Sequence, residues 1–112
     1  MVAYLIKSEK PITRQEGDTP APIVFVVPDS LNMSGYQVKF EVRNASLRRV
    51  MLKSTEDGSI TVDGQMISIP LLESDTKGKP GNHRWEMQFY NNNPVIITTG
   101  RGPFVIINES IR

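Results

Sequence analysis

The single histidine of this chain, His83, is its best candidate for acid–base or metal chemistry, but the sequence gives it no partners. A catalytic base needs a group to activate, and a metal site needs several converging ligands. Asn82 and Arg84 flank His83, and no serine stands in the Gly-x-Ser-x-Gly context of a hydrolase nucleophile. The sequence therefore predicts no enzyme, no catalytic residue, no metal site and no cofactor, with His83 on the surface at the start of a strand.

Three carboxylates close to two glycines invite comparison with a calcium loop. Glu56, Asp57 and Asp63 lack the alternating ligands and the closing bidentate glutamate that such a loop requires. Asp-Gly is also the residue pair that tight hairpins favour, and it occurs here at Asp57-Gly58 and at Asp63-Gly64. The segment is therefore predicted to form turns.

Four basic residues, Arg43, Arg48, Arg49 and Lys53, form a local positive cluster. Together with exposed aromatic residues they suggest one alternative function, a small β-barrel that binds single-stranded nucleic acid. However, the whole chain has 13 basic and 12 acidic residues, a formal charge of +1. Nucleic-acid-binding domains usually carry a marked basic excess, because phosphate neutralisation supplies much of their affinity. The charge balance favours a solvated strand face, and no nucleic-acid partner is expected.

The elements that position these side chains are predicted to be β-strands of one domain. The chain has 112 residues, and its 8 glycines and 8 prolines fall between short apolar runs. We expect a single all-β domain over residues 1–112, an antiparallel sandwich of about eight or nine short strands. The absence of cysteine excludes disulfides, and no apolar stretch is long enough to span a membrane, so no membrane partner is expected.

Two runs alternate between apolar and polar residues, which is the pattern of half-buried strands. One extends from Tyr36 to Arg43 and the other from Arg84 to Tyr90. The predicted core residues of the two runs are Tyr36, Val38, Phe40, Val42, Trp85, Met87 and Phe89. We expect the two strands to lie in opposite sheets, with their apolar faces packed across the core.

The segment Ile23–Val27 differs because its five consecutive residues are all apolar. Such a run is typical of a strand covered on both faces, or of one whose outer face meets a partner. Pro20, Pro22 and Pro28 bracket it, and proline disfavours a central position because it cannot donate to a strand ladder. We therefore predict that this segment is a contact surface at a sheet edge.

Short motifs follow one another along nearly the whole chain: Gly17-Asp18-Thr19, then Leu31 with Ser34 to Arg43, then Asp57 to Val62, Pro80 to Met87, and Gly102 to Ile106. Their order resembles small tailed-phage and prophage structural proteins related to the N-terminal domain of the upper baseplate protein. The pattern of that family is Gly-Asp-Thr, then Leu-Thr-Gly-Tyr-x-Val-x-x-x-Val-Arg, then Gly-x-Tyr-x-Tyr-x-Leu. Ser34 replaces the usual threonine, and His83 and Trp85 stand where the family often has tyrosines.

The resemblance implies an immunoglobulin-like β-sandwich that anchors a longer protein to the virion. The leading hypothesis is a non-enzymatic virion protein, assembled in the host cytoplasm, that serves as an adaptor or decoration module on a capsid, neck, baseplate or fibre. It would contact other virion proteins as a homo-oligomer or in many copies. The predicted contact residues are Ile23, Val24, Phe25, Val26 and Val27, with Tyr4, Ile107 and Ile111 towards the two ends.

Trp85 distinguishes a third hypothesis, a carbohydrate-binding sandwich. That function would need the indole exposed to solvent, whereas a packed core would bury it. Trp85 alternates with Met87 and Phe89 on one strand face, which favours the core.

Overall fold

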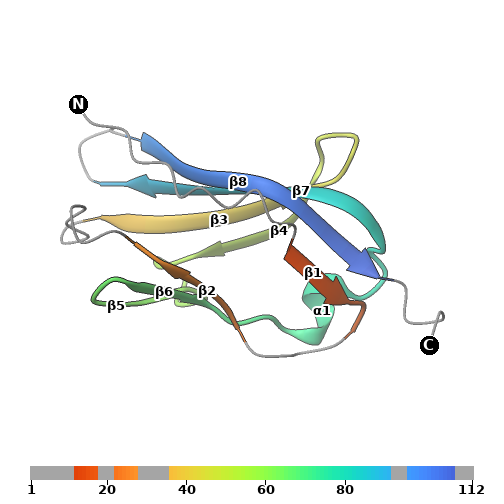
Figure 1. Cartoon of the computed structure of the whole chain (residues 1–112), viewed down its shortest axis with the longest axis horizontal. Helices are drawn as coiled ribbons and strands as arrows, with labels where there is room; N and C mark the ends of the chain where they lie inside the picture. The colour runs from red at the N-terminus through yellow and green to blue at the C-terminus, as the bar shows by residue number, and fades with distance from the viewer. Residues whose placement is uncertain (1–11, 18–21, 28–35, 92–95, 108–112) are drawn as a thin grey trace.

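The computed structural model describes residues 12–17, 22–27, 36–91 and 96–107, with the backbone alone over residues 96–99. These residues form two packed sheets, one five-stranded with the order β1-β8-β7-β3-β4 and one three-stranded with the order β2-β6-β5 (Figure 1). The elements are β1 (Ile12–Gln15), β2 (Ile23–Val26), β3 (Gln37–Arg43), β4 (Arg49–Ser54), β5 (Thr61–Asp63), β6 (Met66–Ile69), α1 (Glu73–Thr76), β7 (Gly81–Tyr90) and β8 (Ile96–Ile107). The prediction of an all-β, immunoglobulin-like sandwich is confirmed.

The strand pairings are antiparallel with one exception. β1 runs parallel to β8, with Ile12 beside Phe104 and Gln15 beside Ile107. The predicted antiparallel architecture is therefore correct except at this edge of the five-stranded sheet. The four-residue α1 is the helix of the described part of the chain, and no helix there is long and apolar enough to cross a membrane.

The two alternating strands lie side by side, which corrects the expectation that they belong to opposite sheets. β3 and β7 are antiparallel neighbours, and their register places Val38 beside Phe89, Phe40 beside Met87 and Val42 beside Trp85. An alternating pattern specifies which side chains share a face, but it does not specify the neighbouring strand. The side chains that cover this face from the second sheet come from β2 and β6.

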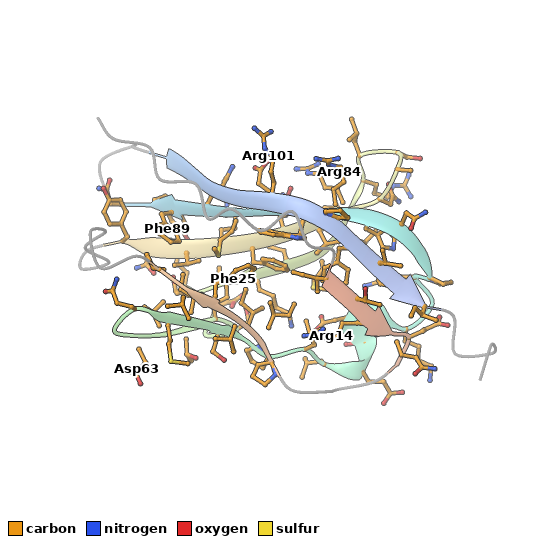
Figure 2. All side chains as sticks on the ribbon, in the orientation of Figure 1. Arg14, Phe25, Asp63, Arg84, Phe89 and Arg101 are labelled. Atoms are coloured by element: carbon orange, nitrogen blue, oxygen red, sulfur yellow. The ribbon has the colours of Figure 1, made fainter. Side chains whose placement is uncertain are left out.

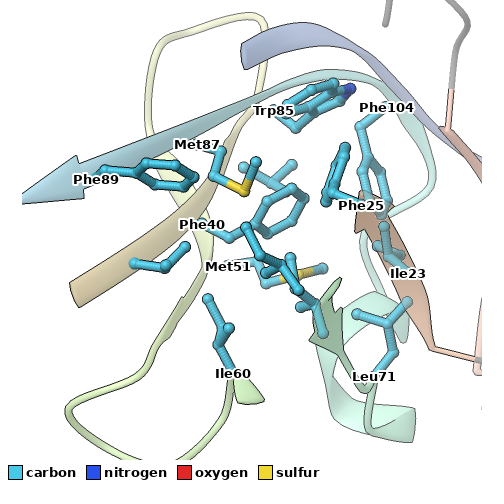
Figure 3. Close-up of a cluster of buried hydrophobic side chains, with 14 of the residues drawn as sticks. Ile23, Phe25, Phe40, Met51, Ile60, Leu71, Trp85, Met87, Phe89 and Phe104 are labelled. Carbon is cyan, nitrogen blue, oxygen red and sulfur yellow. The ribbon is translucent and has the colours of Figure 1, made fainter. Parts of the chain in front are cut away.

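The core fills the space between the sheets. Phe40 is fully buried near its centre, with ring centroids 6.2 Å from Phe25, 5.9 Å from Trp85 and 6.5 Å from Phe104 (Figure 3). Tyr36 is partly buried and packs against this cluster. The buried apolar residues are Ile23, Phe25, Val27, Val38, Phe40, Val42, Met51, Ile60, Ile67, Ile69, Leu71, Trp85, Met87, Phe89, Phe104 and Ile106.

Polar contacts attach α1 to the five-stranded sheet at the end of the sandwich where β1 lies (Figure 1). The Nζ atom of Lys53 on β4 is 2.6 Å from Oδ2 of Asp75, and the Lys53 side chain is only 6% exposed. The backbone N–H of Gly17, just after β1, donates to the buried Oγ1 of Thr76 at 2.9 Å. These contacts join α1 to β4 and to the turn after β1, and the two strands are the opposite edges of one sheet.

Candidate functional site

The predicted contact segment has one buried face and one exposed face. Ile23, Phe25 and Val27 point into the core and are 5%, 7% and 1% exposed. The prediction that these three residues belong to a contact surface is therefore wrong: Phe25 packs 5.1 Å from Trp85, centroid to centroid, and none of the three is available to a partner. The remaining two residues, Val24 and Val26, point outward.

The outer face of β2 continues onto β6 as an apolar surface. Val24 is 45% exposed, Val26 is 67% exposed, and Met66 of β6 is 49% exposed. Val26 and Met66 are register partners, while Val24 lies beside Ser68. We call Val24, Val26 and Met66 the outer β2–β6 face. Sequence reasoning missed Met66, although its alternation with the buried Ile67 and Ile69 placed it on the opposite side from the core.

The position of β2 at the edge of its sheet leaves this face open on one side. Among the described strands, β2 pairs only with β6. Its end is fixed by two hydrogen bonds to Gln65: the Val27 N–H donates to the Gln65 carbonyl at 2.8 Å, and Gln65 Nε2 donates to the Val27 carbonyl at 3.1 Å. These bonds join the end of β2 to the residue just before β6. Within the described sheet β2 is an edge strand, a position whose backbone groups can also pair with a partner.

The other predicted contacts do not join this face. Tyr4 and Ile111 lie outside the described residues. Ile107 ends β8 and is 41% exposed. Figure 1 shows this end of β8 at the other end of the sandwich from the β5–β6 hairpin, and Met66 is the first residue of β6 after that hairpin loop. The Ile107 carbonyl also accepts the Glu16 N–H at 2.8 Å.

The carboxylates around Asp57 form turns, as their spacing predicts. The Ser59 hydroxyl and the Ser59 backbone N–H, the latter at 2.8 Å, both donate to Asp57 Oδ1. These hydrogen bonds, the hydroxyl first, lower the pKa of Asp57 because they stabilise the carboxylate. Gly58 has φ +80° in this turn, and Gly64 has φ +60° in the next. No group of three metal-ligating side chains occurs within the described ranges.

His83 is buried, which corrects its predicted surface position. It is 8% exposed, and its Nε2 lies 2.8 Å from the Lys79 carbonyl oxygen. A ring nitrogen facing a carbonyl oxygen must carry the proton, so Nε2 donates this hydrogen bond. Because His83 alternates in phase with Trp85 and Met87, the sequence pattern itself placed the ring on the core side of β7.

The predicted basic cluster is divided between the two sides of the five-stranded sheet. Lys53 points inward to Asp75, whereas Arg43 and Arg49 lie on the outer side and share the carboxylate of Glu41. The described strands form two separate sheets instead of the closed barrel that the nucleic-acid-binding alternative assumed. The carbohydrate-binding alternative required an exposed Trp85, and this residue is 1% exposed.

Comparisons with known proteins bear on the fold. No family model and no curated protein matches the chain. CopC from Methylosinus trichosporium OB3b is similar with a TM-score of 0.52 at 8% identity, over 96% of each chain. Murine CRIg has a TM-score of 0.40 at 16% identity, over 92% of this chain and 95% of its own. Extracellular domains 3–5 of Drosophila OTK also have a TM-score of 0.40, at 12% identity, and the match covers 93% of this chain and 35% of the OTK chain. At these identities the CopC similarity shows a shared β-sandwich fold and transfers no function.

Proposed function

We propose that this protein is a non-enzymatic structural module of a tailed-phage virion, which docks on neighbouring virion proteins through the outer β2–β6 face. The virion context rests on the resemblance of the Gly17-to-Ile106 motif order to phage baseplate-associated domains. The docking surface rests on one observation: Val24, Val26 and Met66 are exposed together on an edge strand and its neighbour.

The chemistry of this face suits a protein partner. The same outer side of β5 and β6 carries Thr61, Asp63 and Ser68, so Asp63 is its only charged residue among the described positions. Fully burying a valine or methionine side chain contributes about 1.5–3 kcal/mol, so covering these half-exposed groups contributes roughly half of that each. Such a surface gives modest affinity for one contact, which repetition in many copies on a particle would raise.

The first test of this proposal is the presence of the protein in the particle. Phage particles produced by the genome that encodes this chain are purified on a density gradient and quantified by mass spectrometry. We expect the protein to co-sediment with the capsid and tail proteins in multiple copies per particle, while host cytosolic proteins of similar size do not. Abundant protein in the lysate with none in the particles would overturn the proposal.

A further inference from the structure

Four arginines cross the outer side of the five-stranded sheet in adjoining strands. Arg49 on β4, Arg43 on β3 and Arg84 on β7 are successive register partners. Arg101 on β8 lies one diagonal step further, because Arg84 is opposite Pro103, two residues away. All four side chains are exposed, and Figure 2 shows Arg84 and Arg101 on the side of the sheet that faces away from the core. We call these residues the arginine row.

The carboxylates on this side of the sheet do not balance the row. Glu41 pairs with Arg43 and Arg49, the latter at 3.1 Å, while Glu86 accepts a hydrogen bond from Gln88 at 2.9 Å. The side chains of Arg84 and Arg101 make no hydrogen bond or ion pair with any described residue. Like charges in directly opposite positions of adjacent strands destabilise a sheet. Arg84 lies directly opposite Arg43 and, unlike Arg43, has no carboxylate partner among the described residues, so a bound anion would reduce the repulsion between them.

Arg84 and Arg101 border a hollow on this side of the sheet. Its volume is about 160 Å³, and three arginines and two carboxylates are among its lining residues. The full lining is Glu41, Arg43, Asn44, Leu47, Arg84, Trp85, Glu86 and Arg101. The Arg43 side chain is fixed at its wall, because its Nη1 donates to the Leu47 carbonyl at 2.9 Å. A water molecule occupies roughly 30 Å³ in the liquid, so the hollow has room for a tetrahedral oxyanion and bound water.

We propose that Arg84 and Arg101, with Arg43 at the wall, form a binding site for a phosphate group that carries up to two negative charges. Guanidinium groups present planar pairs of N–H donors that match phosphate oxygens. A carboxylate has two oxygens and can pair fully with only one guanidinium group, whereas a phosphate group has enough oxygens for two. The site lies on the sheet opposite the outer β2–β6 face, so it does not depend on the proposed docking surface.

A monoester or inorganic phosphate fits this site better than a nucleic-acid strand. Single-stranded nucleic acid is held by aromatic side chains on which successive bases stack. Tyr90 is the aromatic residue that the register places on this side of β7, and it is partly buried, with the Lys39 ammonium 5.5 Å from its ring centroid. The row itself offers no stacking surface.

The test measures phosphate binding by the whole purified chain. Isothermal titration and thermal unfolding are followed in sodium phosphate, in glycerol 2-phosphate and in sodium chloride at equal ionic strength. We expect phosphate to raise the unfolding temperature more than chloride does. The double variant Arg84→Gln with Arg101→Gln should raise the phosphate concentration at half-saturation roughly tenfold or more, because charge-assisted hydrogen bonds are lost. Tighter binding of glycerol 2-phosphate would identify a monoester as the source, and tighter binding of inorganic phosphate would identify the free ion.

Arg48→Gln is the matched control, since Arg48 is exposed and does not line the hollow. An equal effect of this control, or equal stabilisation by phosphate and chloride, would show general screening and overturn the proposal. Stronger binding of an oligothymidylate with a steep salt dependence would also overturn it, because the surface would then be a nucleic-acid interface. Circular dichroism of the double variant confirms that loss of binding is not loss of fold.

Discussion

Val26 and Met66 are register partners on β2 and β6, and both side chains point away from the core. Phe25, the residue next to Val26, points into the core and contacts the Phe40 and Trp85 rings. One strand thus contributes to folding with one face and is free to contribute to binding with the other. This separation makes the two contributions experimentally distinguishable.

Substitutions on the two faces of β2 are expected to differ strongly in their effect on stability. Phe25→Ala should lower the free energy of unfolding by about 3–5 kcal/mol, because it leaves a cavity among packed aromatic rings. Val26→Lys should change it by about 0.5 kcal/mol or less, since the residue is exposed. Urea unfolding followed by tryptophan fluorescence measures both values. A large loss for Val26→Lys would mean that the outer face already has a structural role in the monomer.

The ion pair between Lys53 and Asp75, whose side chains are 6% and 16% exposed, is expected to contribute far more to stability than the exposed pair between Lys77 and Glu73. Removing the carboxylate leaves the buried Lys53 ammonium uncompensated, so Asp75→Ala should cost about 3 kcal/mol. The Lys77 and Glu73 side chains are each 62% exposed at 3.2 Å separation, and Lys77→Ala should cost about 0.5 kcal/mol or less. Similar losses for the two variants, measured in the same urea titration, would contradict the structural role of the Lys53–Asp75 pair.

The stability of the hairpin between β5 and β6 should depend on the positive φ of Gly64. The loop consists of Gly64 and Gln65, and Gly64 has φ +60°. A Cβ added at Gly64 would meet no other atom within 4 Å. The cost of Gly64→Val is therefore backbone strain rather than a clash, about 1–2 kcal/mol. Gly64→Asn should cost less, because asparagine tolerates positive φ. Thermal unfolding of the two variants tests this order, and equal losses would argue against strain as the cause.

The hydrogen bonds from Ser59 to Asp57 should make stability depend on pH in the acidic range. They hold the pKa of Asp57 in the folded protein below its ordinary value of 3.8. The folded state then binds its proton less tightly than the unfolded state, so the stabilisation is present above that value and is lost as pH falls through the lowered pKa. Ser59→Ala should raise the pKa of Asp57 towards the ordinary value, as measured by NMR titration of the carboxyl carbon. An unchanged pKa would show that these hydrogen bonds are absent in solution.

The residue pattern predicted which side chains of a strand are buried better than it predicted which strands are adjacent. Alternation in β3 and β7 placed Val38, Phe40 and Trp85 in the core, because the two-residue period of a strand determines which side chains are buried. It did not reveal that β3 and β7 are adjacent, since strand pairing depends on contacts far apart in sequence. The same limit applies to the arginine row: Arg84 and Arg101 join Arg43 only through the order of strands in the sheet.

Lys53 and Leu52 illustrate where local reasoning failed. Hydropathy alone would bury Leu52 and expose Lys53, yet Leu52 is 39% exposed and Lys53 is buried. The partner that permits this arrangement, Asp75, lies on α1, far along the chain, and the β3–β4 register is irregular between Val42 and Arg43. Neither the distant carboxylate nor the register shift could be predicted from the residues of β4.

The central claim, that the outer β2–β6 face docks on the virion, is tested most directly by particle incorporation of a surface variant. Val24→Lys with Val26→Lys is compared with Leu52→Lys, which introduces a lysine at an exposed apolar position on the edge strand of the other sheet. Each variant is expressed in a phage lacking the wild-type copy, and its amount in gradient-purified particles is quantified by mass spectrometry. We expect the double variant to fold and to be lost from particles, while Leu52→Lys is incorporated as the wild type is. Incorporation of the folded double variant at the wild-type level would contradict the claim.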